Sequence, residues 1–244
     1  MRLDLFFAAA LTISSLGDIP TDLRAEQRNI PVDLELSFVV DASGSIDDDE
    51  LYLQRKGYAD ALVNPRVISA ITSGFLRSIA IAYIEFSGTG CSQMSVNWTR
   101  VYNQSSAKEF GNKILSLPKI DCLGGNAIGE AVALTVGSIE DNQFEGTRRV
   151  IDVSGDGPNT LAPSIEVVRA EAVSKQITIN ALAIERPSMP DLPEYFKRSV
   201  AGGPGSFVMK VENRSAFARA ILREILREIA DINVLDRPEA TRLN

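Results

Sequence analysis

Apolar residues along the chain form short runs of strand length, separated by segments in which apolar positions recur with helical spacing. Residues 32–40 alternate at first and end fully apolar, which predicts a strand in a sheet covered on both faces. Further strands are predicted at 78–86, 94–101, 148–154, 177–184 and 206–211. The short link before residue 94 predicts that the second and third strands form an antiparallel hairpin.

Between the strands, helical spacing predicts helices at 47–62, 105–117, 127–140, 163–175, 192–200 and 215–232. The first opens with an acidic run, which suits the positive end of a helix dipole, and Ser105 or Ser106 is expected to cap the second. The last helix is amphipathic. Its charged residues are expected to form a solvated face: Arg219, Arg223, Glu224, Arg227 and Glu228.

Strands that alternate with helices predict an α/β fold with a mostly parallel sheet. In such folds, ligands bind beyond the carboxyl ends of the strands, near the point where the strand order reverses. This rule directs attention to three loops, which lie after Val40, before Ala127 and after Ser154.

The composition narrows the chemistry of these loops. The 244 residues include no histidine, which excludes Ser-His-Asp and Cys-His nucleophiles and histidine-bound zinc, so any metal must be held by oxygen. The net charge of −7 argues against nucleic-acid binding, which normally needs a basic face. A hydrophobic content of 45% with 23% charged residues is typical of a soluble globular protein, and the length favours one large domain.

Oxygen-bearing side chains occupy the predicted loops. The first loop carries Asp41, Ser43 and Ser45 in the pattern D-x-S-x-S, and the third carries Asp156 between two glycines. Carboxylates and hydroxyls suit a hard divalent ion, Mg²⁺ or Mn²⁺, with Ca²⁺ as a further option. Two other interpretations stay open: simple capping of the following helix, and a phosphatase-type nucleophilic aspartate, although Ser43 stands where that chemistry places a second acid.

A family resemblance follows from the order of these motifs. D-x-S-G-S, a Gly-Gly loop before a helix, and an apolar strand ending in S-G-D-G together resemble the von Willebrand factor A domain and its metal-ion-dependent adhesion site. The segments 53–58, 148–159 and 179–184 look like an uncharacterised bacterial family of exported A-like domains. The resemblance covers residues 32–231. It implies a three-layer, doubly wound sheet of about six strands, mostly parallel with one antiparallel edge strand, and helices on both faces.

The resemblance also implies a ligand set. Asn126 falls where the family has a threonine, and its longer amide either supplies a ligand oxygen or weakens the site. Asp152, inside its strand, is expected to form a buried hydrogen bond or ion pair instead of binding metal. The residues that match direct or water-mediated ligands are Asp41, Ser43, Ser45 and Asp156.

The ends of the chain indicate its compartment. Arg2 and a short apolar run predict a signal peptide over 1–17, although a buried first helix or strand is an alternative. A tether over 18–31, an A-like domain over 32–232 and a tail over 233–244 would follow. No second long apolar run occurs, so the mature chain is expected to lack a transmembrane segment and to be periplasmic or secreted.

The chain has two cysteines, Cys91 and Cys122, which in an exported protein are candidates for a disulfide and in a cytosolic one would be separate thiols. In the topology that the resemblance implies, both lie at the metal end of the sheet. A disulfide that fixes the loop before Asn126 is therefore expected.

Three functions compete. The leading hypothesis is a protein-binding module in which a partner's acidic residue completes the coordination of the metal, without catalysis. The second is a Mg²⁺-dependent hydrolase or phosphoryl-transfer enzyme, against which stands the absence of Lys or Arg from the three loops. The third is a scaffold whose metal site is degenerate at Asn126.

Overall fold

A computed structural model describes residues 29–44, 46–120, 122, 124–212 and 216–235. Six strands form one sheet in the order β3-β2-β1-β4-β5-β6. Only the pair β2–β3 is antiparallel, so the expected sheet with one antiparallel edge strand is confirmed. The strands are β1 (Ile30–Asp41), β2 (Ile79–Phe86), β3 (Gln93–Val101), β4 (Phe144–Gly155), β5 (Ile177–Ile184) and β6 (Val208–Val211).

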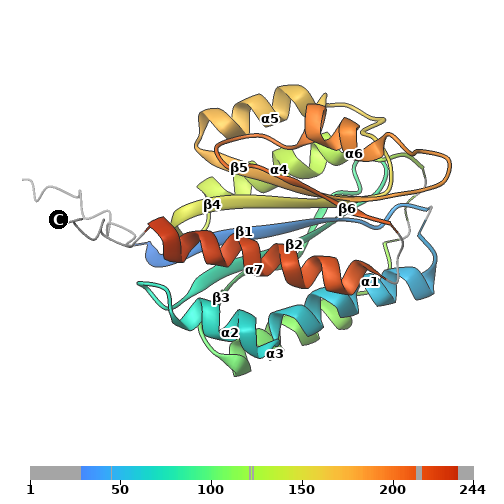
Figure 1. Ribbon diagram of the computed structural model, residues 1–244. Coiled ribbons are helices and arrows are strands. Elements are labelled where there is room, and N and C mark those ends of the chain that lie inside the picture. The colour runs from blue at the N-terminus through green and yellow to red at the C-terminus, as the bar shows by residue number, and fades with distance from the viewer. Residues whose placement is uncertain (1–28, 45, 121, 123, 213–215, 236–244) are drawn as a thin grey trace, which may run out of the picture.

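Helices cover both faces of this sheet and complete a three-layer α/β fold (Figure 1). One face carries α1 (Asp48–Leu62), α2 (Pro65–Thr72), α3 (Gln104–Leu115) and α7 (Phe217–Leu235). The other carries α4 (Ile128–Glu140), α5 (Ile165–Ser174) and α6 (Leu192–Tyr195), which continues into a π-helical turn over Phe196–Val200.

The alternation of side chains in β1 supplies both halves of the core. Leu36 and Phe38 point toward the layer of α1 and α7, while Val39 points toward α4 and α5. Tyr58 of α1 packs on Phe38 with ring centroids 4.8 Å apart and on Phe217 of α7 at 5.9 Å. These aromatic contacts fasten α1 and α7 to the central strand.

One prediction about a helix cap needs correction. The cap of α3 is Asn103, not Ser105 or Ser106: its side chain accepts from Ser106 N at 2.9 Å, and Ser106 Oγ accepts from Asn103 N at 3.1 Å in return. The short α2 was not predicted, although Asn64 caps it and a proline occupies its first turn. The acidic start of α1 is confirmed as a capping box between Asp47 and Glu50.

The prediction that the glutamates of α7 belong to its solvated charged face is wrong. Arg219, Arg223 and Arg227 are exposed, but Glu224 and Glu228 are 0% and 1% exposed, because they turn inward over the sheet. Glu228 pairs with Arg148 of β4 at 3.6 Å and accepts from the Asn180 side chain of β5. Glu224 faces Asp152 of β4, which is itself buried.

The predicted signal peptide, most of the tether and most of the tail lie outside the described residues, so these boundaries stay predictions. Within the described part of the chain, the domain begins with β1 at Ile30 and ends with α7 at Leu235. None of the helices in this part is long and apolar enough to cross a membrane.

Candidate functional site

The three predicted loops meet at the carboxyl end of the sheet, around a cavity of about 260 Å³. Ser43, Asn126 and Asp156 line this cavity, and the buried Asp41 lies beside it at the end of β1. Ser45, the remaining predicted ligand, lies outside the described residues. The other lining residues are Gly44, Gly124, Gly125, Gly157, Thr160, Arg186 and Met189.

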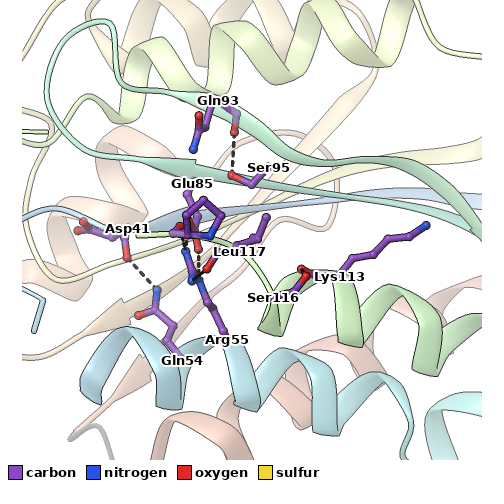
Figure 2. Close-up of polar contacts among 10 residues, drawn as sticks. Asp41, Gln54, Arg55, Glu85, Gln93, Ser95, Lys113, Ser116 and Leu117 are labelled. Carbon is purple, nitrogen blue, oxygen red and sulfur yellow. Dashed lines mark hydrogen bonds and ion pairs between the residues drawn. The ribbon is translucent and has the colours of Figure 1, made fainter. Parts of the chain in front are cut away.

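Two hydrogen bonds hold Asp41 in place, one from the neighbouring Ser43 and one from α1. Its Oδ1 accepts from Ser43 N at 2.8 Å, a local turn that curls the D-x-S segment around the carboxylate. Its backbone carbonyl accepts from the Gln54 side chain at 2.8 Å, as Figure 2 shows. Gln54 is itself buried, with 6% of its surface exposed. The helix therefore orients the strand end that carries the carboxylate.

A buried ion pair beside the site supports the neighbouring chain segments (Figure 2). The Arg55 guanidinium donates to both carboxylate oxygens of Glu85 in β2, each at 2.7 Å. The same group donates to the carbonyls of Leu117 at 2.6 Å and Pro118 at 2.9 Å. This fork satisfies the buried charges and fixes the segment that leads to Cys122.

The Gly-Gly loop positions Asn126. Gly124 and Gly125 have φ values of +76° and +80°, a left-handed conformation that glycine adopts without strain. Asn126 and Thr160 exchange two hydrogen bonds, from Asn126 N to Thr160 Oγ1 at 2.9 Å and from Thr160 N to Asn126 O at 3.0 Å. A Cβ at Gly157 would collide with the Asn126 amide nitrogen, so the second glycine of S-G-D-G makes room for that side chain.

The expected disulfide is present: Cys91 and Cys122 are bonded, with their Cα atoms 6.4 Å apart. It joins the turn between β2 and β3 to the loop before Asn126. Two hydrogen bonds run in parallel with it, from Ala127 N to Ser87 O at 2.9 Å and from Ser87 Oγ to Cys122 O at 3.3 Å. The disulfide and the two hydrogen bonds therefore hold the loop that carries Asn126 against the segment that follows β2.

The start of α4 is capped from another loop. Ala127 provides no side-chain cap, and Asn159 Oδ1 instead accepts from Gly129 N at 2.9 Å. Gly129 also lets the Pro163 carbonyl lie close to the start of α4, because a Cβ at this position would collide with it. Hydrogen bonds and close packing thus join the loop after β4 to the loop before α4.

Two acidic groups share this small volume. Burial, and then the negative charge of Asp156, raise the pKa of Asp41 to about 6, while hydrogen bonds from Ser43 oppose the shift. The Asp41 Oδ2 atom is buried and has no hydrogen-bond partner among the described residues. A cation at this position would stabilise both carboxylates.

A cation of the protein already contacts Asp156. Arg186, two residues beyond β5, donates from its guanidinium to Asp156 Oδ2. Arg186, Thr160 and Met189 were not predicted. Arg186 follows a strand of the same sheet, so the rule on strand ends applied to it as well. A fourth loop, after β5, therefore brings a cation to the cavity that the three predicted loops lack.

The donor set fits a divalent ion. An orphaned buried carboxylate oxygen, a second carboxylate, a hydroxyl and an amide surround a cavity with room for water ligands. No cluster of three or more Cys, Asp or Glu side chains suited to a metal occurs among the described residues. Any ion here would thus depend on two carboxylates, Asp41 and Asp156, with neutral oxygens completing its shell.

A larger polar cavity of about 580 Å³ lies at the opposite end of the sheet. Its buried acid, Glu35, accepts from Asn142 Nδ2 and from Gly146 N, both at 2.7 Å. Each oxygen of this carboxylate already accepts a hydrogen bond from the chain, in contrast to Asp41 Oδ2.

The sheet order and the two helix layers give the chain the fold of a von Willebrand factor A domain. Similar solved structures include proximal thread matrix protein 1 from the mussel byssus with a zinc-occupied MIDAS motif (14% identity, TM-score 0.59, 83% of this chain and 49% of that one). Others are the pilus adhesin SpaC from Lactobacillus rhamnosus GG (14%, 0.57, 83% and 30%) and a von Willebrand factor type A protein from Catenulispora acidiphila (18%, 0.52, 82% and 43%). The chain thus spans half or less of each of these proteins.

Residues 31–233 match the family described as "Protein of unknown function (DUF1194)", and the chain belongs to this family. A comparison with curated proteins found no match. The resemblance to A domains drawn from the sequence motifs is confirmed at the level of the fold.

Proposed function

We propose that this domain is a metal-ion-dependent protein-binding module. Asp41, Ser43 and Asp156, with Ser45 and Asn126, would hold Mg²⁺ or Mn²⁺, and Ca²⁺ is a further candidate. The observation that carries the proposal is the orphaned Oδ2 of buried Asp41 beside a cavity lined by Asp156. A buried carboxylate oxygen without a donor is costly unless a proton or a cation compensates it.

The role of the ion would be recognition. The ion prefers six or more oxygen ligands, so a carboxylate from a partner protein could occupy a position that the side chains of this domain leave to water. Ion-dependent recognition agrees with the similar structures, which include a pilus adhesin and a matrix protein with a zinc-occupied MIDAS motif. We expect the domain to bind its partner without catalysis.

The disulfide and the adhesive relatives support an exported protein, periplasmic or secreted. The partner would be met outside the cytoplasm. A pull-down from the cell envelope of the source organism, with and without chelator, should identify it by mass spectrometry.

Titration calorimetry with Mg²⁺ and Mn²⁺ tests the ion site, with Asp41→Asn as the critical variant. This change keeps the side-chain shape and removes a buried charge. The metal-free variant should therefore be as stable as the wild type or more stable, yet lose ion binding. Asp60→Asn, at an exposed position of α1, is the matched control and should bind like the wild type. Equal ion affinity in the wild type and Asp41→Asn would refute the site.

One observation favours a second candidate, a scaffold with a degenerate site. Arg186 already gives Asp156 a positive partner, as a protein that has dispensed with the metal would require. In that case neither ion should raise the melting temperature at any concentration, and partner capture should be insensitive to chelator.

A further inference from the structure

Arg186 is the only Lys or Arg among the described residues that line the cavity. It lies after β5, whereas Asp156, which it contacts, lies after β4. The Asp156 side chain is 2% exposed, while the Arg186 side chain retains 29% exposure. A buried carboxylate is thus paired with a guanidinium that still reaches solvent.

The backbone of Arg186 is fixed independently of its side chain. Its carbonyl accepts from Met189 N at 2.9 Å, and the two residues form an isolated β-bridge. The long side chain can therefore change rotamer without disturbing the fold. Departure of the guanidinium from Asp156 needs no backbone rearrangement.

A divalent ion and this guanidinium compete for one carboxylate. An ion bound between Asp41 and Asp156 would lie against the carboxylate whose Oδ2 Arg186 contacts, and its charge would repel the guanidinium at short range. In the absence of the ion, removal of Arg186 would take the guanidinium contact away from the buried charge of Asp156. The two cations therefore replace each other.

We propose that Arg186 is the resident counter-ion of this site: it neutralises Asp156 in the metal-free domain and is displaced when a divalent ion binds. The inference rests on the proposed function, and it adds the residue that sets the ion affinity. Arg186 acts on the site through its contact with Asp156 and is not a ligand of the ion. Its presence lowers the affinity for the ion and protects the fold when no ion is bound.

Arg186→Gln tests the proposal by calorimetry with Mg²⁺, and Arg66→Gln, at an exposed position of α2, is the charge-matched control. Arg186→Gln should bind Mg²⁺ about tenfold more tightly than the wild type, the effect expected for the loss of one charge-assisted hydrogen bond. Arg66→Gln should leave the affinity unchanged. Arg186→Lys, which keeps the charge without the planar fork, should give an intermediate affinity.

A metal-free measurement separates competition from a general change in packing. Without ions, Arg186→Gln should lower the melting temperature, and the double variant with Asp156→Asn should restore it, since the neutral amide no longer needs a counter-ion. An additive loss in the double variant would overturn the counter-ion role.

The outcomes also separate this inference from the proposed function. Binding by the wild type, with equal or weaker binding by Arg186→Gln, would overturn the counter-ion role and leave the ion site standing. Binding only by Arg186→Gln would support the inference strongly, because Arg186 would then block the site. Absence of binding by the wild type and both Arg186 variants would overturn both proposals.

Discussion

The buried carboxyl pair between β4 and α7 should make the stability of the domain depend on pH. Asp152 and Glu224 are 1% and 0% exposed, and their four oxygens have no hydrogen-bond donor among the described residues. Other charged or titratable groups nearby are Glu228 and Arg148, which pair with each other, and Tyr58 of α1, which donates to Ser154 at 3.0 Å. Asp152 and Glu224 therefore face each other, and a shared proton is what makes their contact favourable.

The sign and size of the effect follow from the raised pKa values. Burial raises the pKa of Asp152 from 3.8 to about 6. Burial and the charge of Asp152 raise the pKa of Glu224 well above its usual value. The folded protein keeps a proton that the unfolded chain releases, so this stabilisation is complete below about pH 4 and is lost as pH rises through about 6. For Asp152 the loss amounts to about 3 kcal/mol of unfolding free energy.

Glu224→Gln is the critical variant, because it keeps the shape of the side chain and gives Asp152 an amide donor. Urea unfolding should be followed at several values between about pH 4.5 and about pH 8, by circular dichroism and by the fluorescence of Trp98, the only tryptophan. At the alkaline end the variant should be more stable than the wild type by roughly 1–3 kcal/mol, and the difference should shrink toward acid.

Glu109→Gln, at an exposed position of α3 paired with Lys113, is the matched control and should leave the pH profile unchanged. Because Asp41 also has a raised pKa, the comparison rests on the difference between variant and wild type at each pH. A difference that is constant across the range, or a variant that is less stable at alkaline pH, would refute the shared proton.

Three further predictions concern the site. If the ion binds as proposed, its affinity should fall about tenfold per pH unit below pH 6, because Asp41 with its pKa of about 6 must be deprotonated; calorimetry at several pH values would show this, and a flat profile would contradict it. Replacement of both Cys91 and Cys122 by serine, which opens a loop with a sequence separation of 31 residues, should cost about 3–4 kcal/mol in urea unfolding; an unchanged midpoint would show that the parallel hydrogen bonds suffice. Gly125→Ala, at a φ of +80° and with a Cβ 2.7 Å from Leu161, should cost about 1–2 kcal/mol and weaken ion binding, whereas Gly44→Ala, which meets no atom within 4 Å, should change the stability little.

Local pattern was sufficient for the strands, for every helix except the short α2, and for the position of the candidate site. The apolar run from Val32 onward predicts a central strand because both of its faces must be buried, and the short link before β3 predicts the antiparallel edge. Strand ends share one edge of a parallel sheet, so Asp41, Asn126 and Asp156 could be placed together from the sequence. The disulfide needed the topology implied by the family resemblance, because two cysteines alone do not reveal whether they pair.

Only the tertiary structure decided how the charged side chains are used. From helical periodicity, Glu224 and Glu228 are polar residues like the exposed arginines of α7. Periodicity could not show that they face charged and polar side chains of β4 and β5, namely Asp152, Arg148 and Asn180. The pairing of Arg186 with Asp156 likewise depends on the adjacency of β4 and β5, since 30 residues separate the partners in the chain. Periodicity reports which side chains prefer water, whereas the partner of a buried charge is set by long-range packing.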